Sequence, residues 1–176
     1  MVEERSRRRR VNARAFLRLL LGRYLQRDPR AIELTTGPDG KPALVGGSLH
    51  FNLSHSGALG LVALSRTFEV GVDLERIRPV ARMERIAARL FDPDTRQAVA
   101  NGARELRLFR FFEAWTRLEA RQKCVGTGLF GKRQERLETI TLEPERDCLG
   151  ALAWRPLEER GNLFPPPELA FFQFHP

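Results

Sequence analysis

Two acidic residues one position apart give the strongest chemical signal in the sequence. Asp73 and Glu75 lie in the segment VGVDLE at 70–75, whose alternation predicts a β-strand. Because residues two apart on a strand point to the same face, both carboxylates would share one side while Val72 and Leu74 face a core. Hard carboxylate oxygens suit Mg²⁺, which completes its shell with water and substrate phosphates. Taken alone, the pair also fits two ordinary surface acids on an edge strand.

A second acidic motif follows in the segment WTRLEARQK at 115–123, which predicts a helix. Trp115, Glu119 and Lys123 are spaced by four residues and therefore share one helix face. Glu119 could complete a metal site or act as a base, Lys123 could contact a phosphate, and Trp115 would anchor the helix. The alternative is an intrahelical Glu–Lys pair, which stabilises a helix by only about 0.3 kcal/mol. Three carboxylates and a lysine on two elements predict a magnesium ion that carries a diphosphate.

Polar residues at the end of another predicted strand form a third candidate element. The segment FNLSHSG at 51–57 places the hydroxyl of Ser54 and the imidazole of His55 before a glycine turn. A lone histidine is more often structural, but the serines and the glycine around it favour phosphate binding. The turn GPDGKP at 37–42 adds Lys41, followed by Pro42, on a rigid loop. Both segments are candidates for further phosphate contacts.

The composition predicts a folded protein with an anionic partner. The chain has 176 residues, of which 42% are hydrophobic, enough for one domain or two small halves. Its net charge is +8 and its isoelectric point is near 10.8, and only three of its 30 basic residues are lysines. Nucleic acid, an acidic protein and a phosphorylated small molecule all meet this charge requirement.

The cysteines and the apolar runs indicate a cytoplasmic protein. Cys124 and Cys148 have no metal-ligand spacing and define no disulfide framework. No apolar stretch approaches the roughly 20 residues of a membrane span, and the start of the chain does not resemble a signal peptide. We therefore expect a reducing, cytoplasmic setting and no membrane contact.

The elements that must position these residues are of mixed α and β type. Helical periodicity is present at 6–25, 82–90, 93–101 and 105–125. Strand signals are present at 32–34, 49–54, 60–64, 70–73, 137–142, 149–154 and 169–174, with a proline spacer at 165–167. The segments 137–142 and 149–154 are expected to pair as a hairpin. The arginines of the first helix predict a largely solvated face.

Four motifs occur in an order that is typical of one enzyme family. They are GKP at 40–42, FNLSHS at 51–56, GVDLE at 71–75 and WTxxEAxxKxxGxGL at 115–129. The chain resembles the 4′-phosphopantetheinyl transferases, specifically the two-half type that activates peptide and polyketide synthases. The resemblance runs from about residue 9 to residue 129 and more weakly to the end. It is specific because all four motifs are present in sequence.

The resemblance implies an α+β fold of two pseudo-symmetric α/β halves, 1–69 and 70–176, with the active site in the cleft between them. It implies transfer of phosphopantetheine from coenzyme A to a serine of an apo acyl or peptidyl carrier protein, with release of 3′,5′-ADP. Magnesium, or alternatively manganese, would be bound by Asp73, Glu75 and Glu119. Glu119 and Lys123 would be catalytic. The residues expected at coenzyme A are Arg9, Lys41, Pro42, Ser54, His55, Asp73 and Lys123.

The chain also departs from the family pattern. Relatives often carry a lysine directly before the motif glutamate, where this chain has Leu118, and Arg117 or Arg121 are the nearest substitutes. Relatives of the two-half type usually begin and end with strands that are not evident here. A fragment, a misplaced start and a decayed copy are alternative explanations.

Three functions remain open at this point. The first is an active magnesium-dependent holo-[acyl-carrier-protein] synthase of the 4′-phosphopantetheinyl transferase class. It would serve fatty-acid, polyketide, nonribosomal-peptide or lysine biosynthesis and act on an acidic carrier protein. The second is an impaired relative that only binds coenzyme A or the carrier, which Leu118 favours. The third is a nucleic-acid-binding protein, against which the lack of a basic motif interleaved with aromatics counts.

Overall fold

The computed structural model describes residues 2–37, 40–126 and 137–157, with the side chains of 2–10 left out. Helices and antiparallel strands are mixed along the chain, so the expected α+β class is confirmed. The described helices are α1 (Val2–Leu25), η1 (Pro29–Ala31), α2 (Met83–Leu90), α3 (Pro93–Ala100) and α4 (Arg104–Val125). The described strands are β1 (Leu34–Thr36), β2 (Pro42–Leu44), β3 (His50–Ser56), β4 (Leu59–Ser65), β5 (Phe68–Arg76), β6 (Glu138–Glu145) and β7 (Cys148–Pro156).

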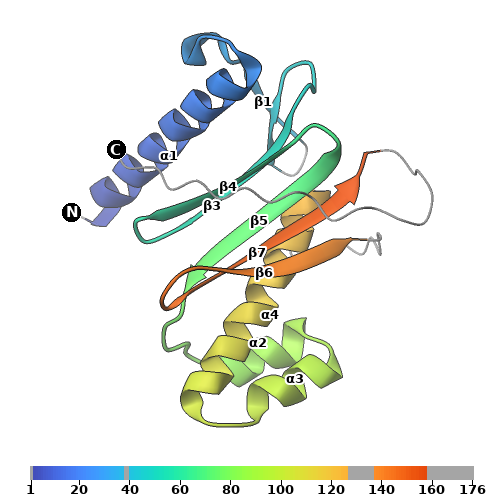
Figure 1. Ribbon diagram of the computed structural model, residues 1–176. Coiled ribbons are helices and arrows are strands. Elements are labelled where there is room, and N and C mark those ends of the chain that lie inside the picture. Colours follow the sequence, from blue (N-terminus) through green and yellow to red (C-terminus); the bar gives the residue numbers. More distant parts are fainter. Residues whose placement is uncertain (1, 38–39, 127–136, 158–176) are drawn as a thin grey trace.

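The first part of the chain packs α1 against two hairpins. β1 pairs with β2, and β3 pairs with β4, both antiparallel. Leu17 and Leu21 of α1 are buried against Ile32, Leu49 and Phe51, which makes a core of its own. Figure 1 shows α1 along the outer side of these hairpins, far from α4. The apolar stripe on α1 therefore serves packing.

The second part of the chain is a three-stranded sheet with helices at one face and end. Its strand order is β5-β7-β6, and all neighbours are antiparallel. Helix α4 lies across this sheet, while α2 and α3 gather at its N-terminal end (Figure 1). Buried aromatic side chains of α4, Phe111 and Phe112, join α2 and α3 in one core with Leu149 of β7.

Small residues bring α4 unusually close to the sheet. Ala120 and Cys124 of α4 pack on Ala151 and Ala153 of β7. At Gly71 of β5 a Cβ would lie 2.1 Å from the Ala120 carbonyl oxygen and 2.2 Å from the Cys124 amide nitrogen. Only glycine fits there, because these contacts are with backbone atoms that cannot rotate away. The C-terminal half of α4 is thereby placed directly over β5.

Side chains join β3 to β5, although the two strands belong to separate sheets. Asn52 Oδ1 accepts from the Val72 N–H at 2.9 Å, and Ser54 Oγ accepts from the Leu74 N–H at 3.1 Å. Ser56 Oγ accepts from the Arg76 N–H at 3.0 Å. We call these three bonds the seam. Their constant offset of 20 residues means that β3 and β5 run parallel.

Most of the expected elements are confirmed within a few residues, including the hairpin of β6 and β7. The strand expected at 32–34 was wrong in position, because β1 begins only at Leu34. The residues before it form η1, a helical turn that Asp28 caps by accepting from the Arg30 N–H. Strand β2 was not expected. The proline spacer at 165–167 and the strand at 169–174 lie outside the described residues, and the division of the chain at 69/70 stays a prediction. In the described part, no helix is both long and apolar enough to cross a membrane.

Candidate active site

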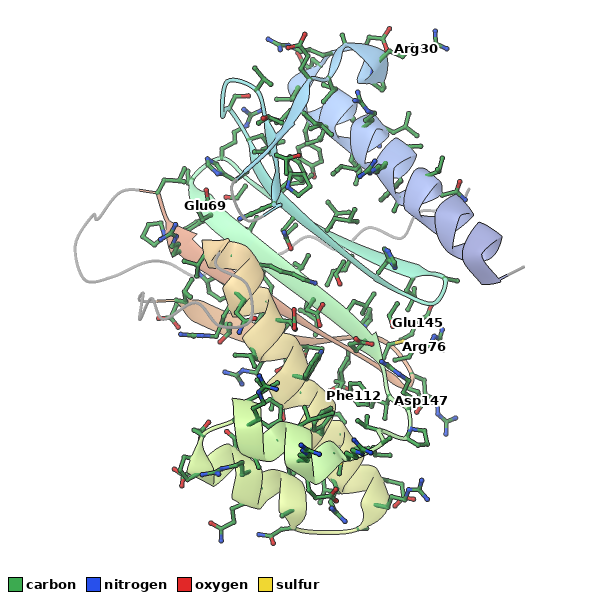
Figure 2. The ribbon with its side chains drawn as sticks, turned by 180° about the vertical axis from the view of Figure 1, so that it is seen from behind. Arg30, Glu69, Arg76, Phe112, Glu145 and Asp147 are labelled. Carbon is green, nitrogen blue, oxygen red and sulfur yellow. The ribbon has the colours of Figure 1, made fainter. Side chains whose placement is uncertain are left out.

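A pocket of about 370 Å³ lies where β3, β5 and α4 meet. It brings together six of the residues predicted from the sequence, and the seam and the Gly71 contact explain why these elements adjoin. Figure 2, which views the molecule from behind, shows α4 on the near side of the sheet, next to β5. The pocket is lined by Leu53, Ser54, His55, Asp73, Leu74, Glu75, Trp115, Glu119 and Lys123.

Asp73 is the buried acid of the pocket, with 7% of its side chain exposed. Its Oδ1 accepts from Lys123 Nζ at 2.6 Å and from Ser54 Oγ at 3.0 Å. Lys123 Nζ also lies 3.3 Å from Ser54 Oγ, so the three side chains form one network. Asp73 Oδ2 is buried and has no hydrogen-bond partner within the described part of the chain. A buried carboxylate oxygen without a partner is a free ligand position.

Glu75 lies two residues further along β5 and lines the same pocket, as the strand alternation predicts. Its Oε2 accepts from Arg78 Nη1 at 2.7 Å and, more weakly, from Ser56 Oγ at 3.4 Å. The Arg78 guanidinium also lies 5.3 Å from the centre of the Phe112 ring. Glu75 is thus paired with Arg78, which does not itself line the pocket.

Glu119 enters the pocket from α4, opposite the two acids of β5. Burial raises the pKa of its carboxyl group, and the nearby negative charges of Asp73 and Glu75 raise it further. The Lys123 ammonium acts in the opposite direction without cancelling the shift. Three carboxylates around one pocket repel one another, so an added cation would lower the energy of the site.

The donor set fits a small divalent cation. Three carboxylates supply hard oxygen ligands, and Asp73 Oδ2 is unpartnered. As the side chains stand, no three acids, histidines or cysteines among the described residues converge into a formed metal site. Mg²⁺ requires few protein ligands and takes the remainder from water and phosphates. Asp73, Glu75 and Glu119 are therefore the residues that would hold it.

Trp115, Glu119 and Lys123 share one face of α4, as their spacing predicts, and all three line the pocket. The two arginines considered as substitutes for a lysine at position 118 make contacts outside the pocket. Trp115 lines the pocket and stacks on Phe111 with ring centres 6.0 Å apart. Arg117 Nη2 lies 3.4 Å from Thr139 Oγ1, and Arg121 Nη1 donates to the Leu137 carbonyl at 3.1 Å. Neither arginine lines the pocket, so neither supplies the charge that the family resemblance leads one to expect at the position of Leu118.

Two other predicted coenzyme A contacts, Lys41 and Pro42, are not among the residues that line the pocket. Lys41 Nζ is bonded to Glu69 and to two backbone carbonyls. Pro42 is exposed at the start of β2, paired in register with Thr36. Arg9 lies in α1, and its side chain is outside those that the structure describes.

Two positioning groups of the pocket were missed in the sequence. Asn52 and Ser56 belong to the seam, and Ser56 also reaches Glu75. The available signal was the spacing of small polar residues at 52, 54 and 56, which share one strand face. Arg78 was missed too, because it lies in the irregular segment after β5.

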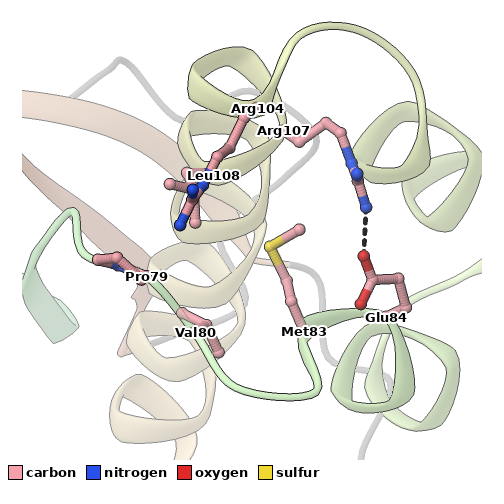
Figure 3. Close-up of a pocket in the computed structure, with 7 residues that line it drawn as sticks. All are labelled: Pro79, Val80, Met83, Glu84, Arg104, Arg107 and Leu108. Atoms are coloured by element: carbon pink, nitrogen blue, oxygen red, sulfur yellow. Dashed lines mark hydrogen bonds and ion pairs between the residues drawn. The ribbon is translucent and has the colours of Figure 1, made fainter.

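A second pocket, of about 260 Å³, lies between the segment after β5 and the N-terminal part of α4 (Figure 3). Val80, Met83 and Leu108 give it apolar walls, and Arg107 forms an ion pair with Glu84 at its rim. It shares no lining residue with the carboxylate pocket. Its side chains offer no metal-binding set.

Similarity to known proteins agrees with this geometry. The model of the 4′-phosphopantetheinyl transferase superfamily matches residues 69–161, which include Asp73, Glu75, Glu119 and Lys123. The chain is 35% identical over 156 residues to the 4′-phosphopantetheinyl transferase HetI of Nostoc sp., covering 86% of this chain and 65% of HetI. It is 39% identical over 124 residues to slr0495 of Synechocystis sp., whose name assigns it to the same class, covering 69% of this chain and 50% of slr0495.

A third relative is the 4′-phosphopantetheinyl transferase AcpT of Salmonella typhi, 39% identical over 104 residues that make up 58% of this chain and 53% of AcpT. The chain thus spans between half and two thirds of the length of these relatives. The family model covers more than half of the chain, including α4 and all of β5 except Phe68, the two elements that carry the acids of the pocket. The chain belongs to the 4′-phosphopantetheinyl transferase superfamily.

Proposed function

We propose that this protein transfers 4′-phosphopantetheine from coenzyme A to a serine hydroxyl of an apo acyl or peptidyl carrier protein. The observation that carries the proposal is the meeting of Asp73, Glu75, Glu119 and Lys123 around one pocket in a chain of this superfamily. In the reaction, the serine oxygen bonds to the phosphorus that carries pantetheine. The bond from that phosphorus to the bridging oxygen breaks, and 3′,5′-ADP leaves.

Glu119 is the group best suited to accept the serine proton. In the metal-free protein, burial and two neighbouring acids raise the pKa of its carboxyl group, which favours uptake of a proton there. A bound divalent cation would act in the opposite direction. Glu119 lies on the α4 side of the pocket, opposite Asp73 and Glu75 on β5. Protonation of Glu119 would relieve the repulsion among the three acids as the transfer proceeds.

Lys123 supplies a donor for the diphosphate, while Ser54 donates its one hydroxyl proton to Asp73 and so holds that acid in place. The Lys123 ammonium is held at the pocket by Asp73, and 32% of its side chain is exposed, so it can also donate to a phosphate oxygen. His55 is exposed at the same rim. A bound Mg²⁺ would neutralise the diphosphate charge and stabilise the leaving group. Phosphoryl transfer needs chiefly such positioning and charge neutralisation.

The charge of the chain supports an acidic macromolecular partner. A net charge of +8 would speed the association of the protein with an acidic carrier by long-range attraction. The proposed setting is the cytoplasm, where coenzyme A and carrier proteins meet. A second candidate, binding of coenzyme A or carrier without transfer, is favoured by Leu118, which leaves the pocket one cation short of the family pattern.

The test is a transfer assay read by mass spectrometry. The full chain is incubated with coenzyme A, Mg²⁺ and apo acyl or apo peptidyl carrier proteins, and the carrier is weighed intact. We expect a phosphopantetheine mass increment on the carrier serine. Coenzyme A binding by calorimetry without any increment, at high enzyme concentration and with every carrier, would support the second candidate instead.

Matched variants assign the residues. Asp73→Asn and Glu119→Gln should each reduce transfer by about 100-fold or more, as expected when a preorganised electrostatic group is lost. Glu113→Gln is the control, because Glu113 is on the same helix but hydrogen-bonds to Thr141 and lies outside the pocket lining. Full activity in either of the first two variants would refute the assignment.

A further inference from the structure

The ammonium group of Lys41 is fully engaged inside the protein. Lys41 Nζ donates to Glu69 Oε2 at 2.8 Å, to the Val70 carbonyl at 3.1 Å and to the Cys124 carbonyl at 3.0 Å. A lysine ammonium has three protons, and these acceptors use all of them. Only 19% of the Lys41 side chain is exposed.

The partner carboxylate is itself fixed from a second side. Glu69 Oε1 lies 2.9 Å from His50 Nδ1 at the start of β3, and 24% of the Glu69 side chain is exposed. Burial alone would raise the pKa of Glu69, but the bonds and charges of Lys41 and His50 outweigh it and hold this pKa below its ordinary value. Lys41, Glu69 and His50 form a cluster that we call the clamp.

The three hydrogen bonds of Lys41 join three separate stretches of the chain. Lys41 comes from the residue before β2, Glu69 and Val70 from the start of β5, and Cys124 from the last turn of α4. The Val70 carbonyl lies on the same side of β5 as the Val72 N–H of the seam, because residues two apart on a strand are equivalent. Lys41 therefore continues the seam by one step and extends it to the end of α4.

The bond from Lys41 to the Cys124 carbonyl connects the clamp to the pocket. Cys124 directly follows Lys123, whose ammonium binds Asp73 on β5. The last carbonyls of a helix have no partner within the helix and attract a cation. Lys41 satisfies one of them and fixes the helix turn that carries Lys123, while the close approach at Gly71 sets the distance between α4 and β5.

We propose that Lys41 is a positioning residue, which locks the C-terminal turn of α4 onto β5 and so sets Lys123 and Glu119 relative to Asp73 and Glu75. This role replaces the coenzyme A contact that the family resemblance implies for Lys41. To reach a ligand phosphate, the ammonium would have to give up three hydrogen bonds and leave Glu69 half-buried with only His50. The structural part stands by itself, and the effect on transfer rests on the proposed function.

The first test measures local opening without any activity. Amide hydrogen exchange of the full chain is compared for wild type, Lys41→Met and Glu69→Gln. Lys41→Met removes the bond to the Cys124 carbonyl, so exchange at the C-terminal turn of α4 should become at least about tenfold faster. Glu69→Gln removes the charge that holds the Lys41 ammonium and should give a smaller increase at the same turn. Glu145→Gln is the control, since it removes an exposed ion pair with Arg76 at the opposite end of β5 (Figure 2).

The double variant Lys41→Met/Glu69→Gln should exchange no faster than Lys41→Met, since that single variant already removes the Lys41–Glu69 bond together with the bond to the Cys124 carbonyl. Unchanged exchange at the end of α4 in both single variants would overturn the proposal. Additive effects would also overturn it, because they would mean that the two residues act separately. If Lys41→Met fails to fold, Glu69→Gln alone decides.

The second test separates positioning from ligand contact. Calorimetry with coenzyme A should give a similar dissociation constant for wild type and Lys41→Met, within about threefold. In the transfer assay the same variant should lose kcat while the KM for coenzyme A changes little. A loss of coenzyme A affinity of about tenfold or more, with α4 exchange unchanged, would restore the ligand-contact role. Exchange and calorimetry give their answers even if no carrier is ever modified.

Discussion

Asn52 Oδ1 and the backbone N–H of Val72 are hydrogen-bonded at 2.9 Å in the buried interior, between strands that share no backbone pairing. The bond gives β5 a partner on the side that β7 does not reach. It also fixes the register of β3 against β5, and this register places Ser54 beside Asp73. The Asn52 amide thus contributes, with the other two seam bonds, to the register that brings β3 and β5 together at the pocket.

Replacement of Asn52 by leucine should destabilise the protein by about 2 kcal/mol. The apolar side chain has a similar size but leaves the buried Val72 N–H without an acceptor, which costs roughly 1–3 kcal/mol. Urea denaturation followed by circular dichroism measures this loss. Ser56→Ala is the matched control at the exposed end of the seam and should lose less than about 1 kcal/mol, because water can replace Ser56 there. If both variants lost the same free energy of unfolding, the contribution of a seam bond would not depend on how deeply it is buried.

Gly71→Ala should be among the most damaging single-methyl changes in the described structure. The added carbon would lie 2.1 Å from the Ala120 carbonyl oxygen, so α4 must move away from β5. We expect a loss of about 3 kcal/mol or more in the free energy of unfolding, together with loss of coenzyme A binding. Gly60→Ala is the control, since the added Cβ would lie 4.0 Å from its nearest neighbour, the Ser54 carbonyl oxygen. Thermal melts and calorimetry of both variants decide the matter.

Glu119→Gln should make the metal-free protein more stable at neutral pH. The folded-state pKa of Glu119 is raised above its ordinary value of 4.5, so ionisation disfavours the folded state. Below pH 4.5 the carboxyl group is protonated in both states and no penalty exists. The penalty grows as the pH rises through the raised folded-state value and is complete above it. Stability curves in a chelator should therefore diverge with rising pH, and a constant difference would contradict this.

Glu69→Gln should show the opposite pH dependence. The pKa of Glu69 is lowered in the folded protein, so its ionised form stabilises the fold above the ordinary value of 4.5. That contribution is lost as the pH falls through the lower folded-state value. The stability difference between wild type and Glu69→Gln should be largest at neutral pH and should vanish in acid. Urea titrations across this range measure it, and a difference that grows toward low pH would refute the clamp electrostatics.

The pocket could be predicted because its chemistry is local in the sequence. Asp73 and Glu75 follow strand spacing, and Glu119 and Lys123 follow helix spacing, so each pair was assigned to one face before the fold was known. The partners of Lys41 could not be predicted, because Glu69 and Cys124 are 28 and 83 residues away. Local patterns carry no information about such long-range contacts. A lysine in a turn is equally suited to a ligand and to the end of a helix.

The position of β1 and the presence of β2 show the same limit. Three-residue strands have too few positions to display alternation, and a capped turn such as Asp28–Ala31 can shift their start. The long elements α4, β5 and β7 were located closely, because each has several periods of buried residues. Gly71 was part of a recognised motif, yet only the packing of α4 explains why no side chain is allowed there.

The seam and the clamp have one more consequence, for the solubility of the protein. β5 has a backbone ladder to β7 along one edge only, and the unpaired groups of the other edge would attract strands of other molecules. Here that edge is capped by Lys41, Asn52, Ser54 and Ser56, one side chain for every second residue. The polar side chains of the seam, together with Lys41, thus also protect this strand from edge-to-edge association.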